Sequence, residues 1–263
     1  MATQVAGVDS TRTARSWERL SGPTLGQFLA TDPDHVGLVP VGATEQHGPH
    51  LPTGTDTLVA RGICARVSAR TGAIVLPEVP VACSFGHGRD LPGTLSLSPT
   101  QFGAVIGQMI DWAASSGLRR LLFVNAHVGN TAPLLTATDP VRLDRPELRV
   151  GVASWWELSE RVGAEATADG PDWHANRAET SLMLALHPEL VDLDAARRAD
   201  DPDRTSGLVF RYTVPQLSRN GVTGRPHEAS VEPGERLLAT IVDLLTDVVE
   251  RGRLEEPPCP GAQ

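Results

Sequence analysis

The sequence of 263 residues is poor in cysteine, in basic side chains and in long apolar runs. Its three cysteines, Cys64, Cys83 and Cys259, are too widely spaced for a disulfide framework or a Cys-X-X-Cys metal site. The 32 acidic residues outnumber the 23 basic ones, which argues against binding to nucleic acid or an anionic membrane. No window approaches the ~18 apolar residues of a membrane span, and the first 16 residues lack the apolar core of a secretory signal. We therefore expect a cytoplasmic protein that has a small partner molecule.

Strand-like and helix-like segments alternate along the chain, which predicts an α/β fold with a mostly parallel sheet and helices on both of its faces. A single domain over residues 19–252 accounts for this length, with a mobile leader at 1–18 and a frayed tail at 253–263. Ligands of such sheets gather at the carboxyl ends of the strands. The pattern predicts strands at 36–43, 73–76, 79–83, 121–124 and 148–154, and helices at 24–30, 56–70, 98–117, 130–138, 177–186 and 232–250.

The stretch from Glu45 to Asp56 places two carboxylates and two imidazoles directly after the first predicted strand. Carboxylate oxygens and imidazole nitrogens suit a divalent cation such as Zn²⁺ or Mn²⁺, and the glycines and prolines between them prevent helix formation. Glu45 and His47 project to the same side of an extended backbone, while Asp56 falls where the next helix begins. A polar surface loop is the alternative interpretation. We interpret the stretch as a metal-binding turn.

Two later segments contain further candidate ligands. His127 follows the apolar strand at 121–124, so a second strand places a histidine at its carboxyl end. His174 and Glu179 lie five residues apart at the start of an apolar helix, where Glu179 taken alone would only complement the helix dipole. A glycine-rich loop at 84–94 can approach a ligand closely. Because all these segments follow strands or begin helices, we expect them to form one site.

The chain resembles the creatininase family of metal-dependent amidohydrolases over about residues 36 to 190. The family includes creatinine ring-openers, formamide hydrolases and the peptidase that trims the mycofactocin precursor peptide. The resemblance implies a three-layer α/β/α sandwich, two divalent ions per chain (Zn, Mn or Fe), and homo-oligomers that are often hexamers. It rests on three segments: Glu45-Gln46-His47-Gly48-Pro49-His50-Leu51-Pro52 with Asp56, Asn125-Ala126-His127-Val128-Gly129-Asn130, and His174-Ala175 with Glu179-Thr180-Ser181.

Carried over by motif position, the resemblance implies that Asp56 bridges the two ions, Glu45 and His127 hold one of them, and His47 holds the other. Paired ions can share a hydroxide that attacks an amide carbonyl, so the expected reaction is hydrolysis of a non-activated C–N bond. The resemblance also implies that His174 is a catalytic histidine. An imidazole titrates near neutrality, and we expect His174 to pass a proton to the departing nitrogen. The alternative is that His174 is itself a ligand.

The second motif departs from the family pattern at a ligand position. Creatinine-hydrolysing members have a glutamate two residues after the motif histidine, where this chain has Gly129. Glu179 is therefore our candidate for the last ligand, and creatinine itself is an unexpected substrate. A small cyclic, formyl or secondary-metabolite amide and a ribosomal precursor peptide both remain open. A catalytically idle member that binds metal or ligand is the alternative from another functional class.

Three tryptophans, Trp155, Trp156 and Trp173, are a concentration in a chain with only 4% aromatic residues. Such rings can wall a pocket for a planar or apolar group, and they can equally form ordinary core packing. Together with Ser84 and Val128, Trp173 is a candidate contact for the substrate.

Overall fold

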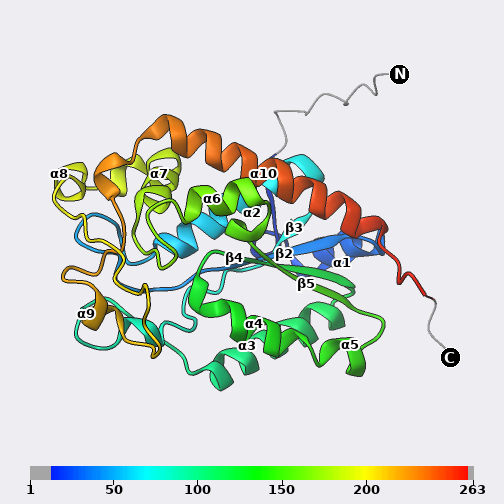
Figure 1. The fold of residues 1–263 in the computed structure, drawn as a ribbon. Helices are drawn as coiled ribbons and strands as arrows, with labels where there is room; N and C mark the ends of the chain where they lie inside the picture. Colours follow the sequence, from blue (N-terminus) through cyan, green and yellow to red (C-terminus); the bar gives the residue numbers. More distant parts are fainter. Residues whose placement is uncertain (1–12, 260–263) are drawn as a thin grey trace.

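The computed structural model describes residues 13–259, which fold into a three-layer α/β/α sandwich around one parallel sheet (Figure 1). The sheet has the strand order β1-β3-β2-β4-β5, and every neighbouring pair is parallel. The fold class expected from the alternating pattern is thereby confirmed. The strands span β1 Arg15–Ser16, β2 Val36–Val41, β3 Ile74–Val75, β4 Arg120–Asn125 and β5 Arg149–Ser154.

The central strands β2 and β4 are apolar and almost wholly buried, as expected where helices cover both faces of a parallel sheet. They pair in register, with Val36 opposite Arg120 and Val41 opposite Asn125. Both strands therefore end at the same level of the sheet. The loop after β2 and the segment after β4 consequently begin side by side.

Helices α2, α6, α7 and α10 pack on one face of the sheet, and α1, α3 and α4 pack on the other (Figure 1). Consecutive residues of β2 point into opposite layers, since Leu38 belongs to the first core and Val39 to the second. The helices span α1 Gly22–Ala30, α2 Thr55–Thr71, α3 Pro99–Ser115, α4 Thr131–Thr138, α5 Val141–Asp144, α6 Glu160–Ala166, α7 Arg177–Leu186, α8 Leu193–Ala196, α9 Val214–Leu217 and α10 Val231–Leu254.

The structure differs from the predicted boundaries at three places. The strand expected at 79–83 makes only isolated bridges, because the prolines around it cannot donate to a ladder. Residues 1–12 of the expected leader lie outside the described part, but Arg15 donates its backbone N–H to Ser68 Oγ (2.9 Å) and belongs to β1. At the other end, α10 extends into the expected tail, where Arg253 pairs with Asp32 (2.8 Å).

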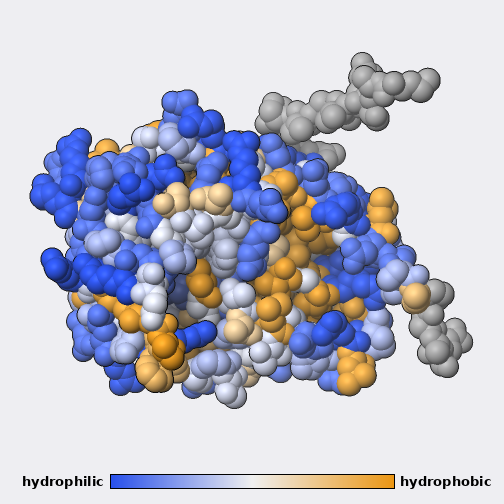
Figure 2. Space-filling model, in the orientation of Figure 1, coloured by the Kyte–Doolittle hydropathy of each residue, from blue (hydrophilic) through white to orange (hydrophobic). Residues whose placement is uncertain are grey.

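Strand β5 forms one edge of the sheet, and most of its residues are only half-buried. Figure 2 shows hydrophobic surface gathered over this edge, between the two helical layers. Leu122, Val150 and Val248 of α10 line this surface. Within residues 13–259, no helix combines the length and the apolar character needed to cross a membrane.

Candidate metal centre

Loops and helix starts from three parts of the chain meet at the carboxyl ends of β2 and β4. Glu45 and His47 lie on the loop after β2, and His127 follows β4. Asp56 and Glu179 occupy the first turns of α2 and α7. All five side chains are buried. Their ligand atoms approach one another in groups, so the structure brings together every ligand that the sequence and the family resemblance suggested.

The five side chains form two groups that share Asp56. In the first, His127 Nδ1 lies 3.2 Å from Glu45 Oε1 and 3.4 Å from Asp56 Oδ2. In the second, His47 Nε2 lies 3.0 Å from Asp56 Oδ1 and 3.8 Å from Glu179 Oε1. The two oxygens of one carboxylate therefore face different groups, which is the arrangement of a bridging ligand.

The donor atoms of these groups suit divalent ions. Both carboxylate oxygens of Glu45, His47 Nε2 and Asp56 Oδ2 are buried and have no hydrogen-bond partner among the described residues. Buried polar atoms without a partner carry a large desolvation cost, so a native protein rarely retains four of them in one place. Oxygen and nitrogen ligands ~2.0–2.2 Å from a tetrahedral ion are about 3.3 Å apart, close to the separations seen here. The residues present therefore fit zinc or manganese.

Backbone carbonyls set the orientation of both ligand imidazoles. His127 Nε2 donates to the carbonyl of Cys83 (2.9 Å), which leaves Nδ1 facing Glu45 and Asp56. His47 Nδ1 donates to the carbonyl of Glu45 (3.2 Å), which leaves Nε2 facing Asp56. Hydrogen bonds of this kind fix the tautomer of a metal-binding histidine and its ring orientation.

The charges of the site perturb its titration strongly. Burial opposes ionisation of Glu45, but His127 and His87 hold the pKa of this carboxyl well below its usual value. Burial also opposes protonation of the two ligand histidines. Nevertheless, Asp56 and Glu179 raise the pKa of His47 well above its ordinary value, and Glu45 raises that of His127 to about 9. Burial raises the pKa of Asp56 to about 6. Without metal, the two ligand histidines, His47 and His127, therefore retain their protons at neutral pH.

Gly129, at the position of the missing family glutamate, has no room for a side chain. A Cβ built there would overlap both the Cys83 carbonyl oxygen and the ring of His127. Glu179 lies instead in the second group, where its Oε2 accepts the backbone N–H of Ala175 (2.6 Å) and its Oε1 faces His47. Glu179 thus lies with His47 and Asp56, whereas Gly129 lies beside His127 of the other group.

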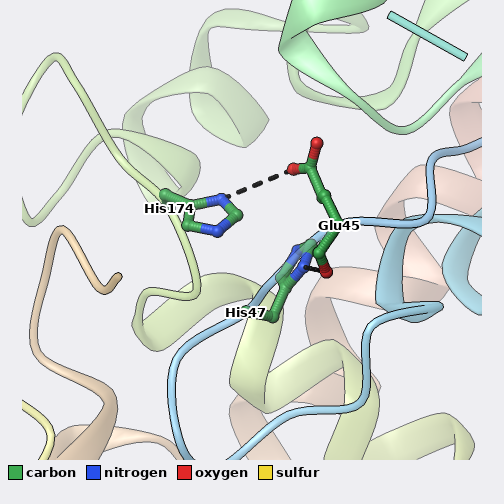
Figure 3. Close-up of side chains that lie close together, drawn as sticks. All are labelled: Glu45, His47 and His174. Atoms are coloured by element: carbon green, nitrogen blue, oxygen red, sulfur yellow. Dashed lines mark hydrogen bonds and ion pairs between the residues drawn. The ribbon is translucent and has the colours of Figure 1, made fainter. Parts of the chain in front are cut away.

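His174 lies beside Glu45 and His47 of the loop that follows β2 (Figure 3). Its backbone pairs with Thr223 in both directions (3.0 and 2.8 Å), and its Nδ1 points toward Glu45 Oε1 (3.8 Å). Burial, with His47 and His87 nearby, lowers the pKa of His174 well below the usual value. Our expectation that this imidazole titrates near neutrality is therefore wrong for the metal-free site, where it is neutral.

A cavity of about 210 Å³ opens beside the two ligand groups. All three candidate substrate contacts, Ser84, Val128 and Trp173, line it, and Ser84 Oγ is buried without a hydrogen-bond partner among residues 13–259. The three tryptophans stack edge to face, with ring centroids 5.6 to 5.8 Å apart. Trp155 is fully buried in the core and Trp156 packs against that core, so only Trp173 walls the cavity.

Two polar residues of the site were not identified from the sequence. His87 of the glycine-rich loop lines the cavity, with Nε2 2.9 Å from Glu45 Oε1. Gln46 is buried between the two ligands of the first motif and contacts both His87 and His174. The histidine in a loop at 84–94 was a visible signal for the first of these. The role of Gln46 depends on side-chain directions that a linear pattern does not contain.

The chain is similar to known proteins over most of its length. The creatininase family model, described as creatinine amidohydrolase, matches residues 18–249. Creatinine amidohydrolase of Pseudomonas putida is 32% identical over 242 residues, covering 86% of this chain and 91% of the relative. The mycofactocin precursor peptide peptidase of Mycobacterium tuberculosis is 32% identical over 239 residues, covering 85% of this chain and 87% of the peptidase.

Solved structures agree with this relationship. A crystal structure of creatinine amidohydrolase superposes with a TM-score of 0.82 at 30% identity, covering 92% of this chain and 99% of that one. Further creatininase structures are described as a Zn-Zn form and a Mn form. The chain therefore belongs to the creatininase family and is an amidohydrolase that acts on carbon-nitrogen bonds.

Proposed function

We propose that the protein is a binuclear metal-dependent amidohydrolase. The observation behind this proposal is that Asp56 directs one carboxylate oxygen into each of two ligand groups, Oδ2 toward His127 and Oδ1 toward His47. Glu45 completes the first group and Glu179 the second. Two bound divalent ions would supply Lewis-acid activation of a water molecule and of the amide carbonyl.

His174 is the residue that we expect to move the proton. Its Nε2 is 2.7 Å from the carbonyl oxygen of Gln46, which can only accept, so Nε2 carries the hydrogen and Nδ1 has a free lone pair. Nδ1 takes a proton from the attacking water while the oxygen adds to the carbonyl carbon. The same proton then passes to nitrogen as the C–N bond breaks, which avoids an amide anion as leaving group. The lowered pKa keeps the resting imidazole neutral, so its Nδ1 lone pair is free before the water attacks.

The cavity volume of about 210 Å³ favours a small amide or the end of a peptide over the middle of a folded chain. Ligand pockets for drug-sized molecules are larger, ~300–1,000 Å³. The names of two relatives, one acting on creatinine and one on a precursor peptide, span both options. Gly129 argues against creatinine, because the glutamate of creatinine-hydrolysing members is absent and a side chain there would overlap the Cys83 carbonyl.

The test is hydrolysis by the metal-loaded enzyme of a panel of cyclic amides, formamides and short peptides. We expect His174→Ala to lower kcat by at least ~10²-fold with two ions still bound, since general acid–base catalysis contributes about that much. His227→Ala is a matched control, because this exposed histidine lies outside the site. Two bound ions and no turnover on any amide would favour the idle, ligand-binding alternative. Loss of an ion from His174→Ala would make His174 a ligand, which its approach to Glu45 and His47 also allows.

We also infer a homo-oligomer. The half-buried edge strand β5 leaves hydrophobic surface between the two helical layers, and a second copy of the chain would cover it (Figure 2). Light scattering of the purified protein measures the number of copies. Substitution of Val150 by Glu should shift the assembly toward the monomer, whereas a monomeric wild type would contradict the inference.

A further inference from the structure

Gln46 is held in one orientation by backbone groups on both sides. Its Oε1 accepts the N–H of Gly48 (3.0 Å), and its Nε2 donates to the carbonyl of Gly221 (3.1 Å). Because a backbone N–H can only donate and a carbonyl can only accept, these two contacts identify the oxygen and the nitrogen of the amide. Gly221 has φ +83° and lies so close that a Cβ would overlap Gln46 Oε1. The glycine at position 221 therefore makes room for this amide, which the two backbone groups orient.

This fixed amide sets the tautomer of His87. The second hydrogen of Gln46 Nε2 points to His87 Nδ1, 3.1 Å away. An amide nitrogen has only hydrogens to offer, so Nδ1 accepts and the hydrogen of the neutral ring lies on Nε2. His87 Nε2 is 2.9 Å from Glu45 Oε1. The N–H bond of His87 therefore borders both the Glu45 carboxylate and the cavity that His87 lines.

The backbone of the same residue sets the tautomer of His174. The Gln46 carbonyl accepts the Nε2 hydrogen of His174 at 2.7 Å, which leaves Nδ1 without a hydrogen. The rings of His87 and His174 are adjacent, with centroids 4.5 Å apart. Gln46 thus makes Nε2 of His87 a hydrogen-bond donor and Nδ1 of the neighbouring His174 an acceptor. Both residues line the same cavity.

We propose that His87 is a further catalytic residue whose Nε2–H donates to the oxygen of the scissile carbonyl, and that Gln46 is the positioning residue that keeps this hydrogen on Nε2. The proposal rests on the proposed function of the site. A carbonyl oxygen that enters the cavity beside Glu45 meets the His87 N–H, and this oxygen gains negative charge when the water adds to its carbon. A donor already fixed in place stabilises that charge without reorganisation. No proton changes hands at His87.

The kinetic test compares His87→Ala with His87→Gln, since the glutamine side chain retains an N–H donor near the position of Nε2. We expect His87→Ala to lower kcat by ~10²–10³-fold, the usual effect of removing one such donor, with KM changed by less than about threefold. His87→Gln should recover at least about tenfold of this loss. Both variants should hold as many ions as the wild type by elemental analysis, and His227→Gln serves as the control for a histidine-to-glutamine change.

The tautomer test does not depend on activity. ¹⁵N NMR of the metal-free wild type should show the His87 imidazole protonated at Nε2 and bare at Nδ1. Gln46→Glu has nearly the same shape but presents an acceptor to Nδ1, so a hydrogen should appear on that nitrogen while circular dichroism stays unchanged. A wild-type ring protonated at Nδ1 would overturn the role assigned to Gln46.

The other outcomes also decide the proposal. Loss of an ion from His87→Ala would make His87 a metal ligand and would overturn the donor role. Near-normal kcat in His87→Ala, or equal losses in His87→Ala and His87→Gln, would show that an N–H at this position does not matter. An inactive metal-loaded wild type would refute the proposed function, and the donor role with it. An active wild type with an unaffected His87→Ala would refute the donor role alone.

Discussion

Metal loading should release close to two protons per chain at pH 7. A nitrogen that coordinates an ion must first lose its hydrogen. In the metal-free site, Glu45 raises the pKa of His127 to about 9 despite burial, and Asp56 and Glu179 raise that of His47 well above its ordinary value. Both ligand imidazoles are therefore protonated at neutral pH, and both hydrogens must leave when the ions bind.

The magnitude follows from these positions. Two pH units below a pKa of about 9, His127 is roughly 99% protonated, and His47, whose pKa is raised well above its ordinary value, adds a second proton. Asp56, whose pKa burial raises to about 6, is mainly ionised at pH 7 and adds only about a tenth of a proton. Each displaced proton weakens binding about tenfold for every unit that the pH falls. Between pH 8 and pH 6 the proton displaced from His127 alone should weaken zinc binding by about 10²-fold, and the proton displaced from His47 should weaken it further.

Titration calorimetry of the metal-free protein with zinc measures the number of protons released, if it is repeated at one pH in buffers of different ionisation enthalpy. The slope of the observed heat against buffer enthalpy gives the number of protons released. His227→Gln should leave the number unchanged, because this histidine is exposed and belongs to neither ligand group. A slope near zero at pH 7, or affinities that do not change between pH 6 and pH 8, would refute the charge arrangement derived from the structure.

Two further predictions concern the same residues. Asp56→Ala should lose both ions by elemental analysis, because the substitution removes a ligand from each group. His47→Ala should lose chiefly one ion. If Asp56→Ala retained two ions, Asp56 would not be the bridging ligand. The metal-free protein should also lose thermal stability as the pH rises from 6.5 to 9. A histidine whose pKa is raised in the folded state stabilises fully below its unfolded pKa and ceases to do so as the pH passes the folded value. A melting temperature that stays constant across this range would contradict the raised pKa of His127.

The layered fold was predictable because its signals are local. Short apolar runs alternate with helices that have clear starts, such as the capping box that Ser98 and Gln101 form at α3. The errors have local causes too. The strand expected at 79–83 pairs only through single bridges because of its flanking prolines, and the short strand at Arg15 depends on the distant Ser68 and Ile74. A contact across more than fifty residues leaves no periodic trace in the sequence.

The ligands of the site were predictable for a topological reason. The register of β2 with β4 places residues after both strands at one edge of the sheet, so Glu45, His47 and His127 had to lie near one another. The surrounding hydrogen bonds could not be predicted in this way. Gln46 acts through Gly221, 175 residues away, and through ring orientations that only the folded chain defines. Spacing identifies which residues meet, but it does not identify which nitrogen of an imidazole carries the hydrogen.

The number of ligands in each group also bears on whether the centre is catalytic. Structural zinc sites are closed by four protein ligands, while catalytic sites have three and keep a position open. Here Glu45, Asp56 and His127 form one group of three, and His47, Asp56 and Glu179 form the other. Glu45, His127 and Glu179 also line the cavity, so each group has a member that faces it. In a catalytically idle member whose ions were only structural, we would expect four protein ligands in each group and no open position beside a cavity. The geometry therefore favours turnover over a purely structural role.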